Sequence, residues 1–176
     1  MPQERMRLGV IAMRRPPVTR WGPAELRPAA VLPQEPAAAP HTRIAEENGA
    51  ETWYLGAAEM VLWAGDTGHH RDNLTSGRPS VWVAIRGQAP ETAEIVCVTV
   101  DPYEGEGLAG DPDLKVEAVP LPAVIRDRVA AFVAANHVEI PFKKRKRSPQ
   151  DPDALTARAP RILPPEEKWD AKGKPR

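Results

Sequence analysis

The alternation of apolar and polar positions along the chain predicts several β-strands followed by one helix. The clearest strands are residues 80–86 (SVWVAIR) and 94–100 (EIVCVTV), which are short, apolar and rich in β-branched side chains. The intervening residues 87–92 suit an antiparallel connection. Because both runs are almost continuously apolar, we expect burial on both faces of this sheet and another element covering it.

Weaker apolar runs predict further strands in the first half of the chain. Residues 7–13 (RLGVIAM) and 29–32 (AAVL) each end at a proline-containing stretch. Residues 52–55 and 59–63 flank Gly56-Ala57-Ala58, which predicts either one bent strand or a hairpin. The Pro/Ala-rich residues 33–42 lack apolar periodicity and predict an exposed loop.

One amphipathic helix is predicted over residues 122–136, where Pro122 fits the first helical position. Ile125, Val129, Phe132 and Val133 share one face of this helix. Strands first and a helix last predict an α+β fold, with the C-terminal helix packed on a mainly antiparallel sheet. A barrel-like form of that sheet stays open as an alternative.

Charge and proline content then divide the chain. Its 176 residues have a formal net charge of zero, but residues 143–176 carry +6 and residues 1–142 carry −6. Of the 21 prolines, 15 lie in the first 40 and last 36 residues. We therefore expect a flexible N-terminus at residues 1–5, one domain at 6–142 and a basic, Pro-rich, disordered tail at 143–176. The single cysteine and the lack of an apolar leader favour a cytoplasmic setting.

Motifs for enzymatic chemistry are missing from the sequence. There is no GxxxxGK[ST] phosphate loop and no GxGxxG motif, and residues 104–110 (EGEGLAG) are better interpreted as a turn. Cys97 lies in the middle of a predicted strand, which favours a buried, protonated thiol rather than a nucleophile. We therefore predict no catalytic residues and no cofactor.

A metal site has little support in the sequence. Adjacent His69 and His70 would point in opposite directions in an extended chain. A loop site built from Asp66, His69, His70 and Asp72 is the one arrangement to weigh, but residues 65–77 are typical of a polar turn with room for a single helical turn. We therefore predict no metal.

The remaining features suggest contact with a partner. Trp53, Trp63 and Trp82 lie in predicted strands and are expected in the core, whereas Trp21 lies beside Arg20 in a Pro-rich stretch. Five consecutive cations follow the predicted domain and would stay hydrated or meet an anionic partner. The candidate partner-binding residues are Arg20, Trp21, Asp66, Arg71, Asn73, Arg78, Lys143, Lys144, Arg145, Lys146 and Arg147.

Three motifs occur in a fixed order along residues 6–147. The first is a strand running into Arg14-Arg15, then Arg20-Trp21 and residues 30–33 (AVLP); the second is residues 72–74 (DNL) and 78–83 (RPSVWV) closing on Arg86; the third is residues 98–104 (VTVDPYE), 116–120, the helix, and 138–147 ending in PFKKRKR. Together they resemble DUF3305, a bacterial family of unknown function.

The resemblance implies a gene neighbourhood with molybdenum-dependent formate dehydrogenase and its maturation factors, and it supplies no catalytic residues. Our leading hypothesis is a non-enzymatic accessory or assembly factor whose partner is a formate dehydrogenase subunit or maturation factor. One alternative is a protein that handles molybdopterin or a nucleotide. Another is nonspecific association with nucleic acid through residues 143–147.

Overall fold

The computed structural model describes residues 1–17, 19 and 21–139, and the predicted tail at 143–176 lies outside them. The chain divides into two units, Met1–Val138 and Glu139–Arg176, and the fold below is that of the first. Its elements are β1 (Gln3–Arg15), β2 (Glu25–Leu32), β3 (Thr42–Glu47), β4 (Ala50–Trp63), η1 (Ala64–Asp66), α1 (Thr67–Thr75), β5 (Ser80–Arg86), β6 (Glu94–Thr99), α2 (Pro102–Ala109), β7 (Leu114–Pro120) and α3 (Ala123–Asn136).

The strands form two antiparallel sheets, which confirms the predicted α+β class. The first sheet has the order β2-β1-β4-β3 and the second has the order β6-β5-β7. Each observed pairing is antiparallel. The sheets remain separate within the described part of the chain and form no closed barrel there, so the barrel-like alternative is wrong.

The predicted strands are present, and some are longer than the apolar pattern suggested. β1 begins at Gln3, which pairs with Trp63. The strand therefore includes three of the five residues at 1–5 that were expected to form a flexible N-terminus. The two runs around Gly56 form the single strand β4. Its bend coincides with a register shift opposite Val10 and Ile11, where Gly56 has a φ of +136°. Of the two options, the bent strand is therefore confirmed.

Besides the short η1, four elements were absent from the predicted set: β3, α1, α2 and β7. β3 and β4 are joined by Asn48 and Gly49, both with positive φ, a combination typical of a tight hairpin turn. α1 occupies the segment interpreted as a polar turn, and α2 includes most of residues 104–110, also interpreted as a turn. Both were missed because their composition is poor in strong helix formers.

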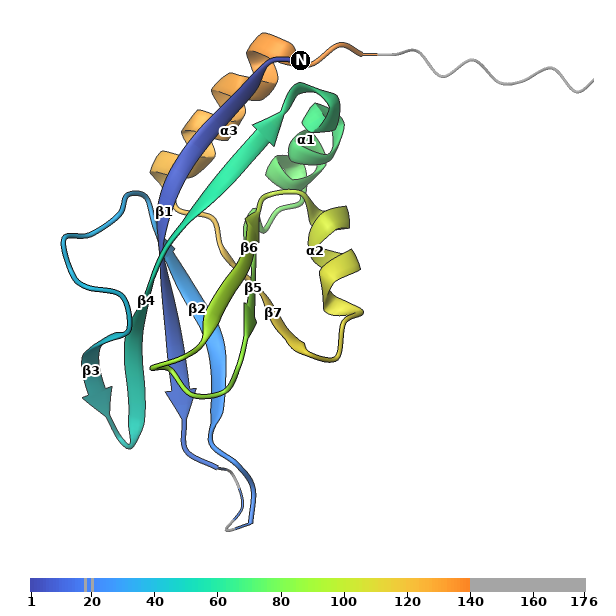
Figure 1. Ribbon diagram of the computed structural model, residues 1–176. Helices are drawn as coiled ribbons and strands as arrows, with labels where there is room; N and C mark the ends of the chain where they lie inside the picture. Colours follow the sequence, from blue (N-terminus) through green and yellow to red (C-terminus); the bar gives the residue numbers. More distant parts are fainter. Residues whose placement is uncertain (18, 20, 140–176) are drawn as a thin grey trace, which may run out of the picture. The chain divides into compact units, whose positions relative to one another are not determined.

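One apolar core joins the two sheets and α3. Leu8, Met60 and Leu62 of the first sheet and Val83 of the second are fully buried in this core. α3 contributes the predicted stripe, Ile125, Val129, Phe132 and Val133, all buried. Pro122 lies at the N-cap with an extended backbone, one position before the helix, rather than at the first helical position. Figure 1 shows α3 running alongside the first half of β1.

The second sheet is covered on its other face by α2. This helix contacts all three strands β5, β6 and β7. Gly105 of α2 lies directly on Trp82 of β5, because a Cβ added at Gly105 would be only 2.2 Å from the Trp82 ring. The cover that we expected for residues 80–86 is thus supplied at this face by a helix the sequence analysis had interpreted as a turn.

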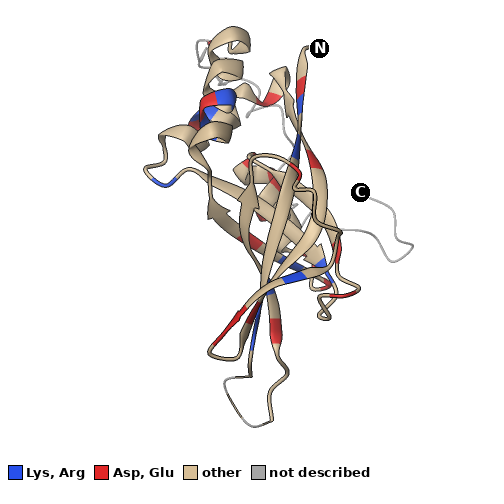
Figure 2. Cartoon of the chain, turned by 90° about the vertical axis from the view of Figure 1, so that its left-hand side faces the viewer, with Lys and Arg blue, Asp and Glu red and all other residues tan. Residues whose placement is uncertain are grey.

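Charged side chains are interspersed by sign over the first unit (Figure 2). Several pair between elements: Arg5 with Glu59, Arg27 with Glu117, and Arg128 of α3 with Glu4 of β1. These pairs are largely exposed, and each adds little to stability. Within the described residues, no helix has the length and apolar character needed to cross a lipid bilayer.

Candidate functional site

A polar cluster lies where the N-terminal end of α1 meets the N-terminal end of α2. α1 follows η1, and its first residue, Thr67, donates a hydrogen bond from Oγ1 to the carbonyl oxygen of Ala64 at 3.1 Å. At the other end, Ser76 donates from Oγ to the carbonyl oxygen of Asn73 at 2.7 Å, and Gly77 follows with a φ of +78°. These contacts fix a helix whose side chains are mostly polar.

Asn73 anchors the middle of α1 to the second sheet. Its Nδ2 donates to the carbonyl oxygens of Ser80 and Val100, both at 2.8 Å, and its Oδ1 accepts from the backbone N–H of Ser80 at 3.0 Å. The residue is 3% exposed. Both polar atoms are thus satisfied inside the protein, as a buried amide requires. We call this set of three bonds the Asn73 clamp.

Asp101 links the end of β6 to α2. Its Oδ1 accepts hydrogen bonds from the backbone N–H groups of Tyr103 at 2.8 Å and Glu104 at 3.4 Å, which makes it the N-cap of α2. Pro102 follows at the first helical position, where its missing N–H has no effect. Asp101 is 8% exposed, so its carboxylate is held in a nearly buried position.

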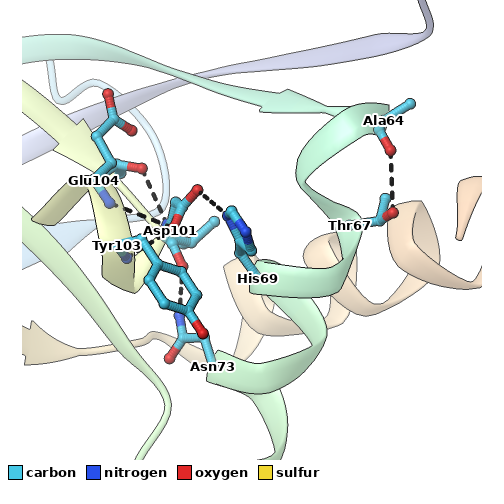
Figure 3. Close-up of polar contacts among 9 residues, drawn as sticks. Ala64, Thr67, His69, Asn73, Asp101, Tyr103 and Glu104 are labelled. Atoms are coloured by element: carbon cyan, nitrogen blue, oxygen red, sulfur yellow. Dashed lines mark hydrogen bonds and ion pairs between the residues drawn. The ribbon is translucent and has the colours of Figure 1, made fainter. Parts of the chain in front are cut away.

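His69 of α1 points at the other oxygen of this carboxylate. Its Nδ1 lies 2.7 Å from Oδ2 of Asp101, and its ring centroid lies 4.4 Å from that of Tyr103 (Figure 3). Asp66, which precedes α1, completes a group of three residues whose ligand atoms lie within 4.8 Å of one another. We call Asp66, His69 and Asp101 the α1–α2 cluster.

Burial controls two titratable groups beside the cluster. His70 is 2% exposed, and its Nδ1 has no hydrogen-bond partner in the described part of the protein. Burial lowers the pKa of His70, against the opposing effect of the Asp101 and Asp66 carboxylates. Burial, with the nearby Glu104 carboxylate, raises the pKa of Cys97 to about 11. The thiol is therefore protonated at neutral pH.

The α1–α2 cluster has the donors needed for a cation. It offers one imidazole and two carboxylates, which are common ligands of divalent metals. No metal was predicted from the sequence, and the one loop site considered there used His70 and Asp72 as metal ligands together with Asp66 and His69. The structure instead joins Asp66 and His69 to Asp101, while His70 turns toward Phe132 of α3 and Asp72 is exposed.

The candidate partner-binding residues do not form one surface. Asp66 and Arg71 lie at α1, but Asn73 is buried in its clamp and presents no surface to a partner. Arg78 lies elsewhere, in a hollow that it shares with Arg15 and Glu25, the last pair of β1 and β2 before their connecting loop. Arg20 and residues 143–147 lie outside the described residues.

The tryptophans also separate into different environments. Trp53 and Trp82 are partly buried, and Trp53 packs against the core. Trp63 is 45% exposed at the end of β4, so its expected core position is wrong. Trp21 is 89% exposed in the connection between β1 and β2. A tight turn holds this position, since the N–H of Gly22 donates to the carbonyl oxygen of Thr19 at 3.0 Å.

The hollow beside this hairpin, about 660 Å³ in volume, is lined by three arginines. Arg27 donates to Glu117 at 2.5 Å and to Glu25 at 2.6 Å, and these carboxylates raise its pKa. Its charge is thus balanced within the protein. Arg15 and Arg78 form no direct ion pair with another residue in the described ranges, although the charge of Arg15 acts on Glu25, whose pKa is lowered mainly by its hydrogen bond with Arg27.

Comparison with known proteins gives one match. The profile of the family DUF3305, described as a protein of unknown function, matches residues 7–146, which is most of the chain. Neither the search of curated proteins nor the search of solved structures gave a match. The resemblance seen in the sequence motifs is thereby confirmed, and the chain belongs to the DUF3305 family.

Proposed function

We propose that this protein is a non-enzymatic accessory factor that binds a protein partner through the tip of the β1–β2 hairpin. The observation that carries the proposal is Trp21, which exposes 89% of its surface. Tryptophan and arginine are the side chains that most often dominate the energetics of protein interfaces. An indole displayed in this way gains substantial free energy when a partner covers it.

Prolines and one turn lie close to Trp21 along the chain. Pro17 and Pro23 restrict the backbone on either side, and the Thr19–Gly22 turn lies between them. Arg15, the last residue of β1 before the connection, and Arg78 add cationic groups in a neighbouring hollow.

We identify the partner as a subunit or maturation factor of a molybdenum-dependent formate dehydrogenase in the cytoplasm. What supports this identification is the gene neighbourhood that the family resemblance implies. A protein that delivers or protects a partner needs an exposed contact residue and no nucleophile of its own. The protonated Cys97 and the turn-held Trp21 are in keeping with such a role.

A pull-down tests the proposal directly. The wild-type chain should recover a formate dehydrogenase subunit or maturation factor, and Trp21→Ala should reduce recovery about tenfold or more. Ile44→Ser is the matched control, because Ile44 is another exposed apolar residue, at 57%, but lies on β3. Failure to recover any such protein, with normal dehydrogenase activity in a deletion strain, would overturn the proposal.

The arginine-lined hollow supports a second candidate function, the handling of molybdopterin or a nucleotide. Two arginines without carboxylate partners are suited to phosphate groups. Calorimetric titration with GTP and with a pterin should show binding that Arg15→Ala and Arg78→Ala weaken, while Arg5→Ala, on the other half of β1, leaves it unchanged. No heat at millimolar ligand would eliminate this candidate.

A further inference from the structure

The α1–α2 cluster brings together three metal-ligating side chains from three different parts of the fold. Asp66 comes from η1, His69 from α1 and Asp101 from the residue that caps α2. Their ligand atoms lie within 4.8 Å of one another. We propose that this cluster binds one divalent transition-metal ion, of the Zn²⁺ or Mn²⁺ class.

Two of the three ligands are held in place by the protein itself. Asp101 is 8% exposed, and its Oδ1 is fixed by two backbone N–H groups of α2, so Oδ2 has a defined position. His69 lies between this oxygen, at 2.7 Å, and the Tyr103 ring, at 4.4 Å between centroids (Figure 3). Such prearrangement of ligands by surrounding groups is typical of metal sites in proteins.

Asp66 is the adjustable third ligand. It occupies the N-cap position of α1, but its side chain makes no capping hydrogen bond. An aspartate at this position usually accepts a bond from the helix backbone. Its carboxylate is instead near His69 and Asp101, and it can rotate because it is only partly buried. Metal–ligand distances of about 2.0–2.2 Å require donor atoms about 3–3.5 Å apart, so the Asp66 donor would move inward while His69 Nδ1 and Asp101 Oδ2, now 2.7 Å apart, would separate slightly.

His70, next to His69 on α1, lies against Phe132 of α3 and is not a member of the cluster. His70 is 98% buried, and its Nδ1 is unpartnered within the described residues. Buried polar atoms are nearly always paired in proteins. The Asn73 clamp, one turn further along α1, shows that this helix can satisfy a buried polar side chain completely.

The donor set determines the class of metal. Mg²⁺ and Ca²⁺ prefer oxygen ligands, whereas an imidazole with carboxylates suits Zn²⁺, Mn²⁺ and related ions. Three protein ligands leave further coordination positions for solvent. A metal bound at His69 Nδ1 replaces the contact with Asp101 Oδ2, and the hydrogen of a neutral imidazole then lies on Nε2, the other ring nitrogen.

Calorimetry of the full chain, freed of metal with EDTA and then dialysed, tests the site. Titration with ZnCl₂ and MnCl₂ should show one ion per chain, while MgCl₂ should bind at least about tenfold more weakly. Asp66→Asn and His69→Ala should each weaken Zn²⁺ binding about tenfold or more. Asp72→Asn is the matched control, because Asp72 is an exposed acid on the same helix outside the cluster.

The outcomes separate cleanly. Asp66→Asn removes no side-chain capping bond, so its metal-free melting temperature should match that of wild type, and weakened metal binding would then reflect the lost ligand. Absence of binding at millimolar Zn²⁺ and Mn²⁺ would overturn the proposal. So would unchanged binding by the Asp66→Asn/His69→Ala double variant, which would assign the ion to other histidines. Trp21→Ala should bind metal as wild type does, so this proposal stands or fails separately from partner binding.

Discussion

The Asn73 clamp and the α1–α2 cluster belong to the same short helix, yet they use their polar groups in opposite ways. In the clamp, both polar atoms of a buried amide are bonded to backbone groups at the start of β5 and the end of β6. In the cluster, Asp66 makes no capping bond, and two carboxylates face one imidazole. A buried polar side chain whose hydrogen-bonding atoms are all paired stabilises the fold, whereas a polar group without such partners is available to a ligand.

The largest expected effect comes from breaking the clamp. Asn73→Ala should lower the free energy of unfolding by about 3 kcal/mol, because it leaves three buried backbone groups without a partner. Urea denaturation followed by circular dichroism measures this change. Asp72→Ala, next to it and exposed, should stay within about 0.5 kcal/mol of wild type. Similar losses for the two variants would contradict a structural role for Asn73.

The reactivity of the Cys97 thiol tests how far burial and the Glu104 carboxylate raise its pKa. With a pKa of about 11, Cys97 should have a thiolate fraction at pH 8 roughly 100-fold below that of an ordinary thiol. Alkylation by iodoacetamide, followed by mass spectrometry, should therefore keep accelerating from pH 8 to above pH 10.

Glu104→Gln should speed this alkylation, since the Glu104 carboxylate raises the pKa, but burial should still keep the rate below that of free cysteine. Glu106→Gln, another exposed acid on α2, is the control. A rate that already levels off near pH 9 in the wild type would show that the thiol is neither desolvated nor close to a negative charge.

Moving α2 should disturb the cluster while leaving the clamp in place. Gly105→Ala places a methyl group where the Trp82 ring lies, so we expect a loss of about 2 kcal/mol in unfolding free energy. Gly107→Ala is a close control, since its added Cβ would meet no atom within 4 Å and alanine favours the helix. Thermal denaturation should place Gly107→Ala at or above wild type, and equal losses for both variants would argue against the close packing of α2.

The smallest expected changes in unfolding free energy distinguish Asp101 and Asp66, the residues that precede α2 and α1. Asp101→Ala should lose about 1 kcal/mol, because Asp101 caps α2 with two hydrogen bonds. Asp66→Asn should change stability by less than about 0.5 kcal/mol in metal-free buffer. Urea denaturation of both variants measures the difference. A loss for Asp66→Asn as large as that for Asp101→Ala would show that Asp66 has a structural role after all.

Local patterns in the sequence were sufficient for much of the fold. α3 and the strands β5 and β6 were predicted because their apolar spacing alone specifies an element that faces a core. β3 was missed, although Asn48-Gly49 is a strong hairpin signal. α2 was missed because Gly105 and Gly107 weaken the helical pattern, while Asp101-Pro102 was the available signal for its start.

The sequence by itself determined the α+β class, the separation of a patterned domain from a basic end, and the family to which the chain belongs. Tertiary structure decided which polar residues meet. His69 and Asp101 are 32 positions apart and become neighbours because the β5–β6 pair returns the chain to α1. Tertiary structure also decided that both polar atoms of Asn73 are hydrogen-bonded, whereas Asp66 makes no capping hydrogen bond. Such differences depend on three-dimensional distances between atoms, and no periodicity along the chain encodes them.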